Sequence, residues 1–498
     1  MKFKFYLLSV IIPIFIHSQS IHDAINWSFE NESGNSRYES MGGAFGALGG
    51  NLSAISNNPA SGAVFELSRL GGSLIVNDNS IKSLYYNNEK TLKSRNSNYQ
   101  AGLIYVLKNY GDGNLNKFSI GFNFQSKNNF NEEFKIYGRS SNSIDNFFLN
   151  NTFGVNINRI SVGPNETTQG VYRWLGDNIG YYAQQAFLGY QSYLLDYDND
   201  SSSYFSLAKY DDGVTHEHSI FSSGFNNLSS LNVSIQFRKN LYMGINLNFN
   251  DVFVEKEIRH FENDFDNDSP ITNIDFRNYL TTNGNGVSIH GGLIYKAGTF
   301  RLGLSYLSPT YYKFEDNLEQ YIETNSIDKD GVRYNDIVDP QVTNIYFYDF
   351  KSPSKLTFSG AAIINNMLIL SLDVISKNYS KSKFKHRNEG VYNDLNDAIT
   401  KNLTNVLDYR FGTELKINQL SLRAGYKAFN NPYNNGENKY LISQSFGVGY
   451  NFDSATLDFA ILNSKYNYNY QLFDTGLTES SRINNKALKL IMSYNIIF

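Results

Sequence analysis

The last twelve residues, Ala487–Phe498, form the segment that most constrains the fold of this chain. Leu488, Leu490, Met492, Tyr494, Ile496 and Phe498 are apolar, and they alternate with a set that contains Lys489, Ser493 and Asn495. One face of such a strand is apolar and the other is largely polar. An edge strand of a soluble sandwich has the same period. A terminal aromatic residue and a two-faced strand also suit a β-barrel with lipid outside and water inside.

The first twenty residues have the features of a secretory signal peptide. Lys2 and Lys4 precede the apolar stretch Phe5–Ile16, which is too short to span a bilayer as a helix. We expect cleavage between Ser18 and Ile21. The chain contains no cysteine, so neither a disulfide nor a lipid anchor on cysteine is expected.

Composition favours a β protein and argues against a polyanion-binding one. The chain has 37 Tyr, 37 Phe and 38 Gly, only 8 Pro, and a formal net charge of -4. Aromatic residues are enriched in strands, and no basic field is present to recruit nucleic acid. No linker of the Pro- or Ser-rich kind divides the sequence. A single large barrel is therefore predicted.

Alternation recurs along the chain and predicts about 14 strands, an even number as in bacterial single-chain barrels. Five hairpins are predicted with short connections: Leu231–Phe237 with Leu241–Phe249, Val287–Tyr295 with Phe300–Tyr306, Leu356–Ile364 with Leu368–Val374, Tyr409–Ile417 with Leu420–Ala428, and Phe446–Phe452 with Leu457–Ile461. Further strands are predicted at Leu70–Leu84, Tyr99–Leu107, Phe118–Phe130 and the C-terminus.

Long polar stretches separate these hairpins and are predicted to be extracellular loops: Tyr85–Asn98, Asn131–Thr215, Arg259–Gly284, Thr310–Pro353, Ser380–Val406, Asn430–Leu441 and Tyr470–Asn484. Since outer-membrane barrels have short periplasmic turns, both termini are expected in the periplasm. Two stretches show helical spacing, Tyr181–Asp196 and Asp394–Leu407. These helices either cap the barrel mouth or line an apolar pocket with Phe187, Tyr190 and Leu194.

Residues Ile21–Phe65 precede the first strand and do not alternate. The segment is dense in Gly and Ala and contains Gly42, Gly43 and the turn-favouring sequence Asn57-Asn58-Pro59. A phosphate-binding loop is not expected, because no strand precedes the glycines. Small residues permit close packing, so we predict a compact plug inside the barrel.

At this segment the sequence resembles the outer-membrane long-chain fatty acid transporters of the FadL/TodX type. The matching residues are Ser40–Phe45, Ser53–Ile55 and the triplet Asn58, Pro59 and Ala60. The resemblance implies a 14-stranded barrel whose N-terminal hatch, residues 21–65, contains Gly42, Gly43 and that triplet, with the barrel over 66–498. It also implies passive, TonB-independent uptake of hydrophobic molecules, most simply long-chain fatty acids, with sideways exit through the wall.

Two basic residues are predicted to hold the ligand's carboxylate. If Asn418-Gln419 is a two-residue turn, Glu414 lies opposite Arg423 and Arg410 opposite Lys427 on the lumen face. Facing cations are unfavourable unless an anion separates them. That anion is either the ligand's carboxylate or an acidic hatch residue, Glu32 or Glu39.

Other roles are considered and not favoured. The Asp triplets at 196–200 and 264–268 lack the Gly and Glu of calcium loops. His216 and His218 could bind a metal or haem. The simpler expectation is that they are exposed to water at the start of a strand, a hydrated strand entry. Ser288 and His290 lack the motif of a nucleophilic enzyme. We expect no enzyme activity, cofactor or metal.

The expected partners are outer-membrane lipids, a hydrophobic small molecule and the barrel assembly machinery, the last through Tyr494 and Phe498. The protein is expected to be an outer-membrane monomer that binds no nucleic acid. The alternatives are a non-transporting family member that docks secreted proteins through its outer loops, and a receptor for haem or another hydrophobic ligand.

Overall fold

A computed structural model describes residues 19–498 except 32, 109–113, 389 and 435–440. Residues 1–18 of the predicted signal peptide therefore lie outside the described residues. Gln19 and Ser20 are described and belong with the segment that follows. Ser20 caps the first helix, and the Gln19 amide donates to Asp316 Oδ2 at 3.0 Å.

The chain forms a closed antiparallel β-barrel of 14 strands, as predicted. The terminal strand pairs with both the preceding strand and the first strand, which closes the sheet. The strands are β1 Arg69–Tyr85, β2 Asn88–Lys108, β3 Leu115–Asn129, β4 Glu132–Ser140, β7 Val214–Phe237, β8 Leu241–Asn263, β9 Ile271–Ala297, β10 Phe300–Leu307, β11 Tyr311–Ile327, β12 Arg333–Val338, β13 Asn344–Lys351, β14 Lys355–Ile364, β15 Leu368–Asn378, β16 Lys383–Lys385, β17 Asn405–Ile417, β18 Leu420–Phe429, β19 Leu441–Asn451, β20 Ala455–Gln471 and β21 Ser480–Ile497.

Some labelled strands are successive parts of one barrel strand. β3 and β4 both pair with β7, and β10 and β11 both pair with β9. Likewise β13 leads into β14 and β15 into β16, while β12 adds a hairpin to β11. Breaks of this kind let a strand bend without leaving the sheet.

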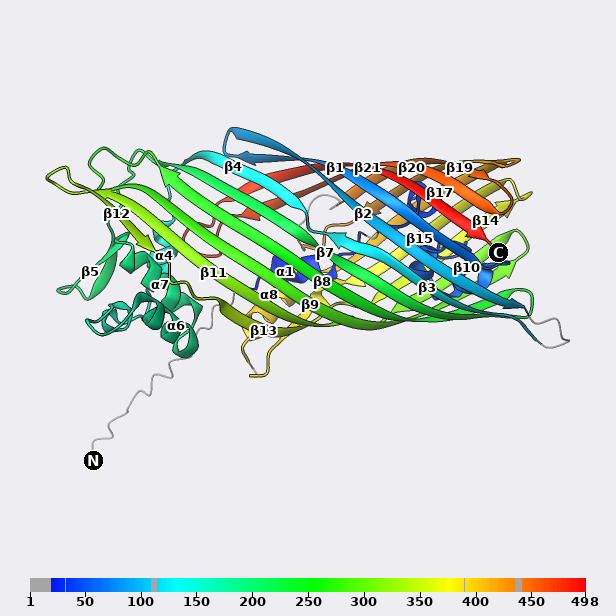
Figure 1. Cartoon of the computed structure of the whole chain (residues 1–498), viewed down its shortest axis with the longest axis horizontal. Coiled ribbons are helices and arrows are strands. Elements are labelled where there is room, and N and C mark those ends of the chain that lie inside the picture. The colour runs from blue at the N-terminus through cyan, green and yellow to red at the C-terminus, as the bar shows by residue number, and fades with distance from the viewer. Residues whose placement is uncertain (1–18, 32, 109–113, 389, 435–440) are drawn as a thin grey trace, which may run out of the picture.

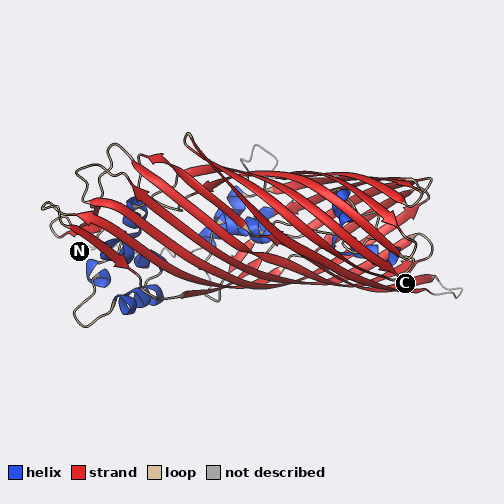
Figure 2. Cartoon of the chain, turned by 45° about the horizontal axis from the view of Figure 1, so that its top comes forward, coloured by secondary structure: helices blue, strands red, loops and turns tan. Residues whose placement is uncertain are grey.

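Helices lie in three places along the barrel (Figures 1 and 2). They are α1 Ile21–Ser28, α2 Ser36–Ser40, α3 Ala54–Asn57, η1 Pro59–Val64, α4 Asp145–Asn151, α5 Ile157–Ile160, α6 Thr168–Asn178, α7 Tyr181–Gln191, η2 Tyr379–Lys381 and α8 Asn393–Asn402. Helices α4 to α7 and the small β5–β6 hairpin (Leu195–Asp198 and Ser203–Ser206) gather at the barrel end opposite the C-terminus. Among the described residues, no helix is long and apolar enough to cross a membrane.

The structure contains all five hairpins predicted from the alternation. Phe237 pairs with Leu241, Ala297 with Phe300, Ile364 with Leu368, Ile417 with Leu420, and Asn451 with Thr456. The connection between β2 and β3 falls on residues 109–113, outside the described part of the chain. The turns of these five hairpins lie at the same barrel end as the C-terminus (Figure 1).

Most of the predicted long loops are wrong, because strands continue through them. β1 and β2 join across Tyr86-Asn87, and β8 and β9 across residues 264–270. The stretch Thr310–Pro353 is largely β11, β12 and β13. Helix α8 ends at Asn402, and Val406, predicted as part of it, lies in β17. The outer part of β2 is exposed or half-buried on both faces. The buried face of β11 mixes Tyr312 and Phe314 with Asp316 and Gln320, which interrupts the apolar alternation that reveals a strand.

The outward face of the barrel is apolar, as the terminal strand predicts. The alternate residues Leu488 to Phe498 are 39% to 59% exposed, whereas Ser493 between them is 1% exposed. Exposed apolar side chains follow the same pattern on the neighbouring strands, among them Leu70, Leu74, Phe446, Phe459 and Ile461. A closed sheet with such a belt has the surface of a membrane-spanning barrel.

A cation in this belt is expected to impair membrane insertion. Arg at a lipid-facing position near mid-bilayer costs roughly 2 to 4 kcal/mol. Leu490→Arg should therefore reduce the amount of heat-modifiable barrel in the outer membrane, measured by electrophoresis of membrane fractions. Leu84→Arg is the control, since Leu84 is also exposed but lies on β1 beyond Asp78 and Lys82. Equal insertion of both variants would contradict the belt assignment.

Candidate transport site

The N-terminal segment, Ile21–Phe65, lies within the barrel. Helix α2 contacts β18 to β21, while η1 contacts β3, β7, β8 and β9 on another part of the wall. Nearly all its described residues are buried, including Ile25, Phe45, Ile55 and Ala60 at 0% exposure. A segment that contacts strands around the wall fills the lumen between them.

The predicted Asn58-Pro59-Ala60 triplet begins η1 and joins the segment to the wall. The Asn58 amide donates to Gly46 O at 2.6 Å and to Leu293 O at 3.1 Å, and its oxygen accepts from Ala60 N at 3.1 Å. Pro59 O accepts from the Asn232 amide at 2.9 Å. The turn is thus fixed against β7 and β9.

Gly42 marks the closest approach of the segment to the wall. Its φ is +63°, and a Cβ there would lie 2.8 Å from the carbonyl oxygens of Phe411 and Tyr426. Gly43 also has a positive φ, +73°. Only glycine combines this conformation with such close contact, which gives a physical reason for both residues.

The predicted register of Arg410 and Lys427 is correct, but each already has partners from the N-terminal segment. Arg410 pairs with Lys427 across β17 and β18. Arg410 Nη1 donates to Tyr38 Oη at 2.9 Å, and Lys427 Nζ lies 3.4 Å from Glu39 Oε2. Of the two predicted acidic partners, Glu39 is in place, and Glu32 lies outside the described residues. The structure therefore favours an anchor for the segment over a ligand-binding pair.

Removing both charges is expected to loosen the N-terminal segment. In Arg410→Gln/Lys427→Gln, Glu39 keeps the hydrogen bond from Gly34 N but loses its ion pair with Lys427, and a buried carboxylate without an ion pair is costly. We expect larger and more frequent small-ion openings in planar bilayers, with fatty acid affinity changed less than twofold. Lys313→Gln, at an exposed position on β11, is the control. A marked loss of affinity with unchanged conductance would restore the ligand-anchor hypothesis.

A second charged cluster was not found by sequence reasoning. Glu30, 8% exposed, is surrounded by Lys127, Lys355 and Lys377 from β3, β14 and β15, with Lys127 Nζ at 3.2 Å and Lys355 Nζ at 2.5 Å. On the neighbouring strands β17 and β18, Glu414 and Arg423 form an ion pair, and Arg37 of the segment binds the same carboxylate. Glu30 and Arg37 thus tie the segment to the wall through ion pairs.

Beside α1 lies a cavity of about 250 Å³ with a mixed lining. Its apolar and aromatic lining includes Trp27, Phe29, Phe130, Ile220, Leu280 and Tyr468. Its polar lining consists mainly of asparagines and also carries Lys256, Lys489, Asp23 and Glu132. A concave site that combines aromatic surface with a few charged groups can hold an amphipathic small molecule.

The cavity reaches a place where the barrel wall lacks backbone pairing. Among the described residues, β2 pairs with β3 from Ala101–Phe124 to Lys108–Lys117 and no further. Beyond this point β3 continues to pair with β7 up to Asn129. Side chains close the interval: the Asn129 amide donates to Asn96 Oδ1 at 3.1 Å and Asn98 Oδ1 at 2.9 Å. We call these three residues the asparagine seam.

The N-terminal segment binds the edge of β3 that β2 leaves open. Ser33 N donates to Ser126 O at 2.8 Å, and Asn31 N donates to Asn128 Oδ1 at 3.1 Å. The Asn128 amide in turn donates to Phe29 O at 2.6 Å. Asn129 is the next residue after Asn128 on β3. A movement of the N-terminal segment would therefore displace the asparagine seam.

The predicted pocket residues Phe187, Tyr190 and Leu194 lie in a packed outer core rather than in this cavity. Helix α7 ends at Gln191, short of the predicted Asp196, so Leu194 follows it. Phe187 and Leu194 are fully buried, and Phe187 packs against Tyr172 with ring centroids 5.9 Å apart. Tyr190 is partly buried beside Tyr204. We define residues 141–213, which carry these helices, as the outer cap. Its core continues into Ile220, Phe276 and Ile322 of the wall.

The two histidines predicted at a hydrated strand entry are buried. His216 and His218 are both 0% exposed, and both contact side chains from neighbouring strands. The expectation of a hydrated entry is therefore wrong. Their contacts with neighbouring rings leave no open face for a haem.

Solved structures resemble this fold at low sequence identity. A Pseudomonas aeruginosa FadL homologue has a TM-score of 0.56 and 12% identity, over 94% of this chain and 99% of its own. The Pseudomonas putida toluene transporter TodX has a TM-score of 0.49, 14% identity, and coverage of 94% and 99%. The Ralstonia pickettii toluene transporter TbuX has a TM-score of 0.47, 13% identity, and coverage of 93% and 98%.

The fold of this chain is thus that of a FadL homologue, which confirms the predicted resemblance to the FadL/TodX type at the level of the fold. No protein-family model matches the sequence, and no curated protein matches it.

Proposed function

We propose that this barrel carries hydrophobic molecules across a bacterial outer membrane by passive, TonB-independent diffusion, with long-chain fatty acids as the first substrate class to test. The observation that carries the proposal is the continuity of the cavity beside α1 with the asparagine seam. A membrane location follows from the apolar belt. The cap end then faces outward and the C-terminus belongs to the periplasmic side, whereas the described chain begins among buried residues, where Gln19 contacts Asp316 and Tyr392.

The proposed exit is sideways through the seam. A molecule in the cavity contacts Phe130, Asn96, Asn98 and Asn129, which also line the interval between β2 and β3. Side-chain hydrogen bonds between neutral groups contribute only about 1 kcal/mol each. The seam is therefore easier to open than a paired strand, and an apolar solute that passes it reaches lipid without crossing water.

The N-terminal segment is the proposed hatch. It fills the lumen below the cavity and holds the β3 edge beside the seam. A shift of the Phe29–Ser33 stretch would release Asn128 and weaken the closure at Asn129. A ligand in the cavity contacts Trp27 and Phe29, which line it. It drives the shift by binding more tightly to the shifted position of this stretch than to the resting one.

Lys256 is the proposed partner of a ligand carboxylate. Its side chain lines the cavity and lies near the Tyr470 ring, 5.9 Å from Nζ to the centroid. A charge-assisted contact of this kind contributes about 1.5 to 3 kcal/mol. The hydrophobic tail needs no specific group, since each buried methylene gains about 0.8 kcal/mol.

The test is binding of a labelled fatty acid to purified barrel. Lys256→Gln should weaken binding about tenfold, the effect of roughly 1.4 kcal/mol, and leave an uncharged alkane of equal length unaffected. Lys313→Gln is again the exposed control. Equal weakening for both ligands would show damage to the cavity rather than loss of a charge partner. No binding of either ligand by the folded parent would reject the proposed function.

A docking role is the second candidate. The outer cap exposes aromatic residues, with Phe153 at 86% and Tyr193 at 62% exposure. Exposed aromatic side chains are frequent in protein interfaces. Phe153→Ser/Tyr193→Ser should leave uptake unchanged under the transport proposal. Loss of protein secretion with normal uptake in that variant would favour docking.

A further inference from the structure

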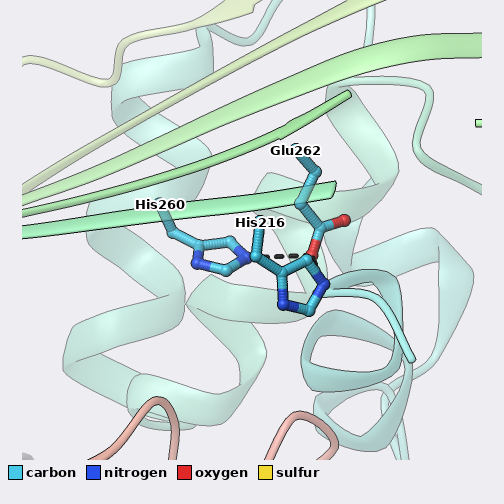
Figure 3. Close-up of side chains that lie close together, drawn as sticks. All are labelled: His216, His260 and Glu262. Atoms are coloured by element: carbon cyan, nitrogen blue, oxygen red, sulfur yellow. Dashed lines mark hydrogen bonds and ion pairs between the residues drawn. The ribbon is translucent and has the colours of Figure 1, made fainter. Parts of the chain in front are cut away.

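Three side chains outside the cavity converge in the wall near the outer cap. His216 lies on β7, and His260 and Glu262 lie on β8 (Figure 3). One ligand atom from each lies within 4.8 Å of the others, and all three side chains are 0% exposed. The hairpin register explains the meeting, because His216 pairs with Glu262 and His218 with His260.

The ligand atoms lie at hydrogen-bond distances from one another, slightly closer than the ligands of a tetrahedral ion. His216 Nε2 lies 3.2 Å and His260 Nε2 lies 2.8 Å from Glu262 Oε1. With metal–ligand bonds of about 2.0–2.1 Å, the ligands of a tetrahedral Zn²⁺ lie about 3.3 Å apart. The backbone oxygen of Asn142, 2.9 Å from His216 Nε2, is a candidate fourth ligand. Small shifts of the side chains would therefore admit an ion.

Each ligand is oriented by a further contact. His216 Nδ1 lies 3.1 Å from Tyr85 Oη, and His260 Nδ1 lies 3.1 Å from His218 Nδ1. His218 Nε2 continues to Tyr470 Oη at 3.3 Å. Glu262 accepts from Ile144 N at 2.8 Å and from the Ser143 hydroxyl. Metal-binding histidines usually have such a partner at the second ring nitrogen, which fixes the tautomer.

We propose that His216, His260 and Glu262 bind a divalent transition-metal ion, with Zn²⁺ as the best match, and that the ion fastens the outer cap to the barrel wall. The outer cap begins with a stretch that contains Asn142, Ser143 and Ile144. Asn142 O contacts the His216 imidazole, and Ser143 and Ile144 donate to the Glu262 carboxylate. The ion would therefore join the first cap residues to β7 and β8. His216 is 15 residues from the lipid-facing Leu231, about 50 Å along the strand and about 35 Å along the membrane normal at a tilt of about 45°, so the site lies outside the bilayer.

The test uses the full chain without a polyhistidine tag. Because the site is fully buried, the protein is unfolded in urea with chelator, refolded with Zn²⁺ and desalted, and its metal content is measured by mass spectrometry. We expect about one ion per folded chain. His260→Gln and Glu262→Gln should each retain less than a tenth of that. The control His290→Gln changes another buried histidine, on β9, and should retain the ion.

Further measurements separate binding from folding. Tyr85→Phe keeps all three ligands and should weaken Zn²⁺ binding 10- to 100-fold through the loss of a single orienting contact. Co²⁺ in place of Zn²⁺ should give the visible absorption of a tetrahedral site. Removal of the ion should speed tryptic cleavage at the exposed Arg159 and Arg173 of the cap. A refolded parent without metal, or an ion retained in both ligand variants, would overturn the proposal.

Discussion

A disulfide across the asparagine seam is expected to stop uptake of hydrophobic solutes and to let it resume when the disulfide is reduced. The chain has no cysteine, so Asn98→Cys/Asn129→Cys introduces the only pair. The Asn129 amide lies 2.9 Å from Asn98 Oδ1, so the two side chains meet at the seam. A disulfide needs Cα atoms about 4.4 to 6.8 Å apart, so its formation is verified by mass spectrometry before uptake is measured. The measurement is the initial rate of labelled fatty acid uptake by cells, with and without a membrane-impermeant reductant.

The control is a matched pair of asparagines in a wall segment with continuous pairing. Asn325 and Asn335 lie directly opposite each other in the β11–β12 hairpin. Asn325→Cys/Asn335→Cys should form a disulfide and leave uptake at the parent rate. Undiminished uptake in the oxidised seam variant, with the disulfide demonstrated by mass spectrometry, would contradict sideways exit at this place.

Removal of residues 21–65 is expected to give an open barrel with poor hydrophobic uptake. The segment fills the lumen and supplies Trp27 and Phe29 to the cavity, so its loss removes both the obstruction and part of the binding surface. Single-channel conductance to small ions should rise severalfold in planar bilayers. Conductance equal to that of the parent, from a barrel that is still heat-modifiable, would contradict a luminal plug.

Sequence reasoning found the membrane part of the barrel because alternation is strong there. Ser493 and Met492 on β21 are 1% and 47% exposed, and this contrast recurs in every predicted hairpin. The outer part of β2 was missed because both of its faces are in contact with water. The residues of β2 from Asn88 to Tyr99, for example, are all exposed or half-buried, so no face is marked by apolar side chains.

The site was predicted only in part, for a related reason. The two-residue turn Asn418-Gln419 gave the correct register of Arg410 and Lys427. Register does not show what fills the lumen, and Tyr38 and Glu39 are the actual neighbours. Asn96, Asn98 and Asn129 resemble loop residues in sequence, and their meeting depends on where β2 leaves β3. His216 and Glu262 are 46 residues apart and meet only because the hairpin is so long.

The most direct measurement of the central claim is the uptake of two labelled solutes by cells that lack their own hydrophobic-compound channels. One solute is a long-chain fatty acid at low concentration, and the other is a hydrophilic sugar of similar mass. The cavity and seam predict that the parent barrel raises the initial rate for the fatty acid well above that of the empty vector, and leaves the rate for the sugar unchanged. A folded, inserted barrel that leaves fatty acid uptake at the empty-vector rate, or raises both rates equally, would contradict the account.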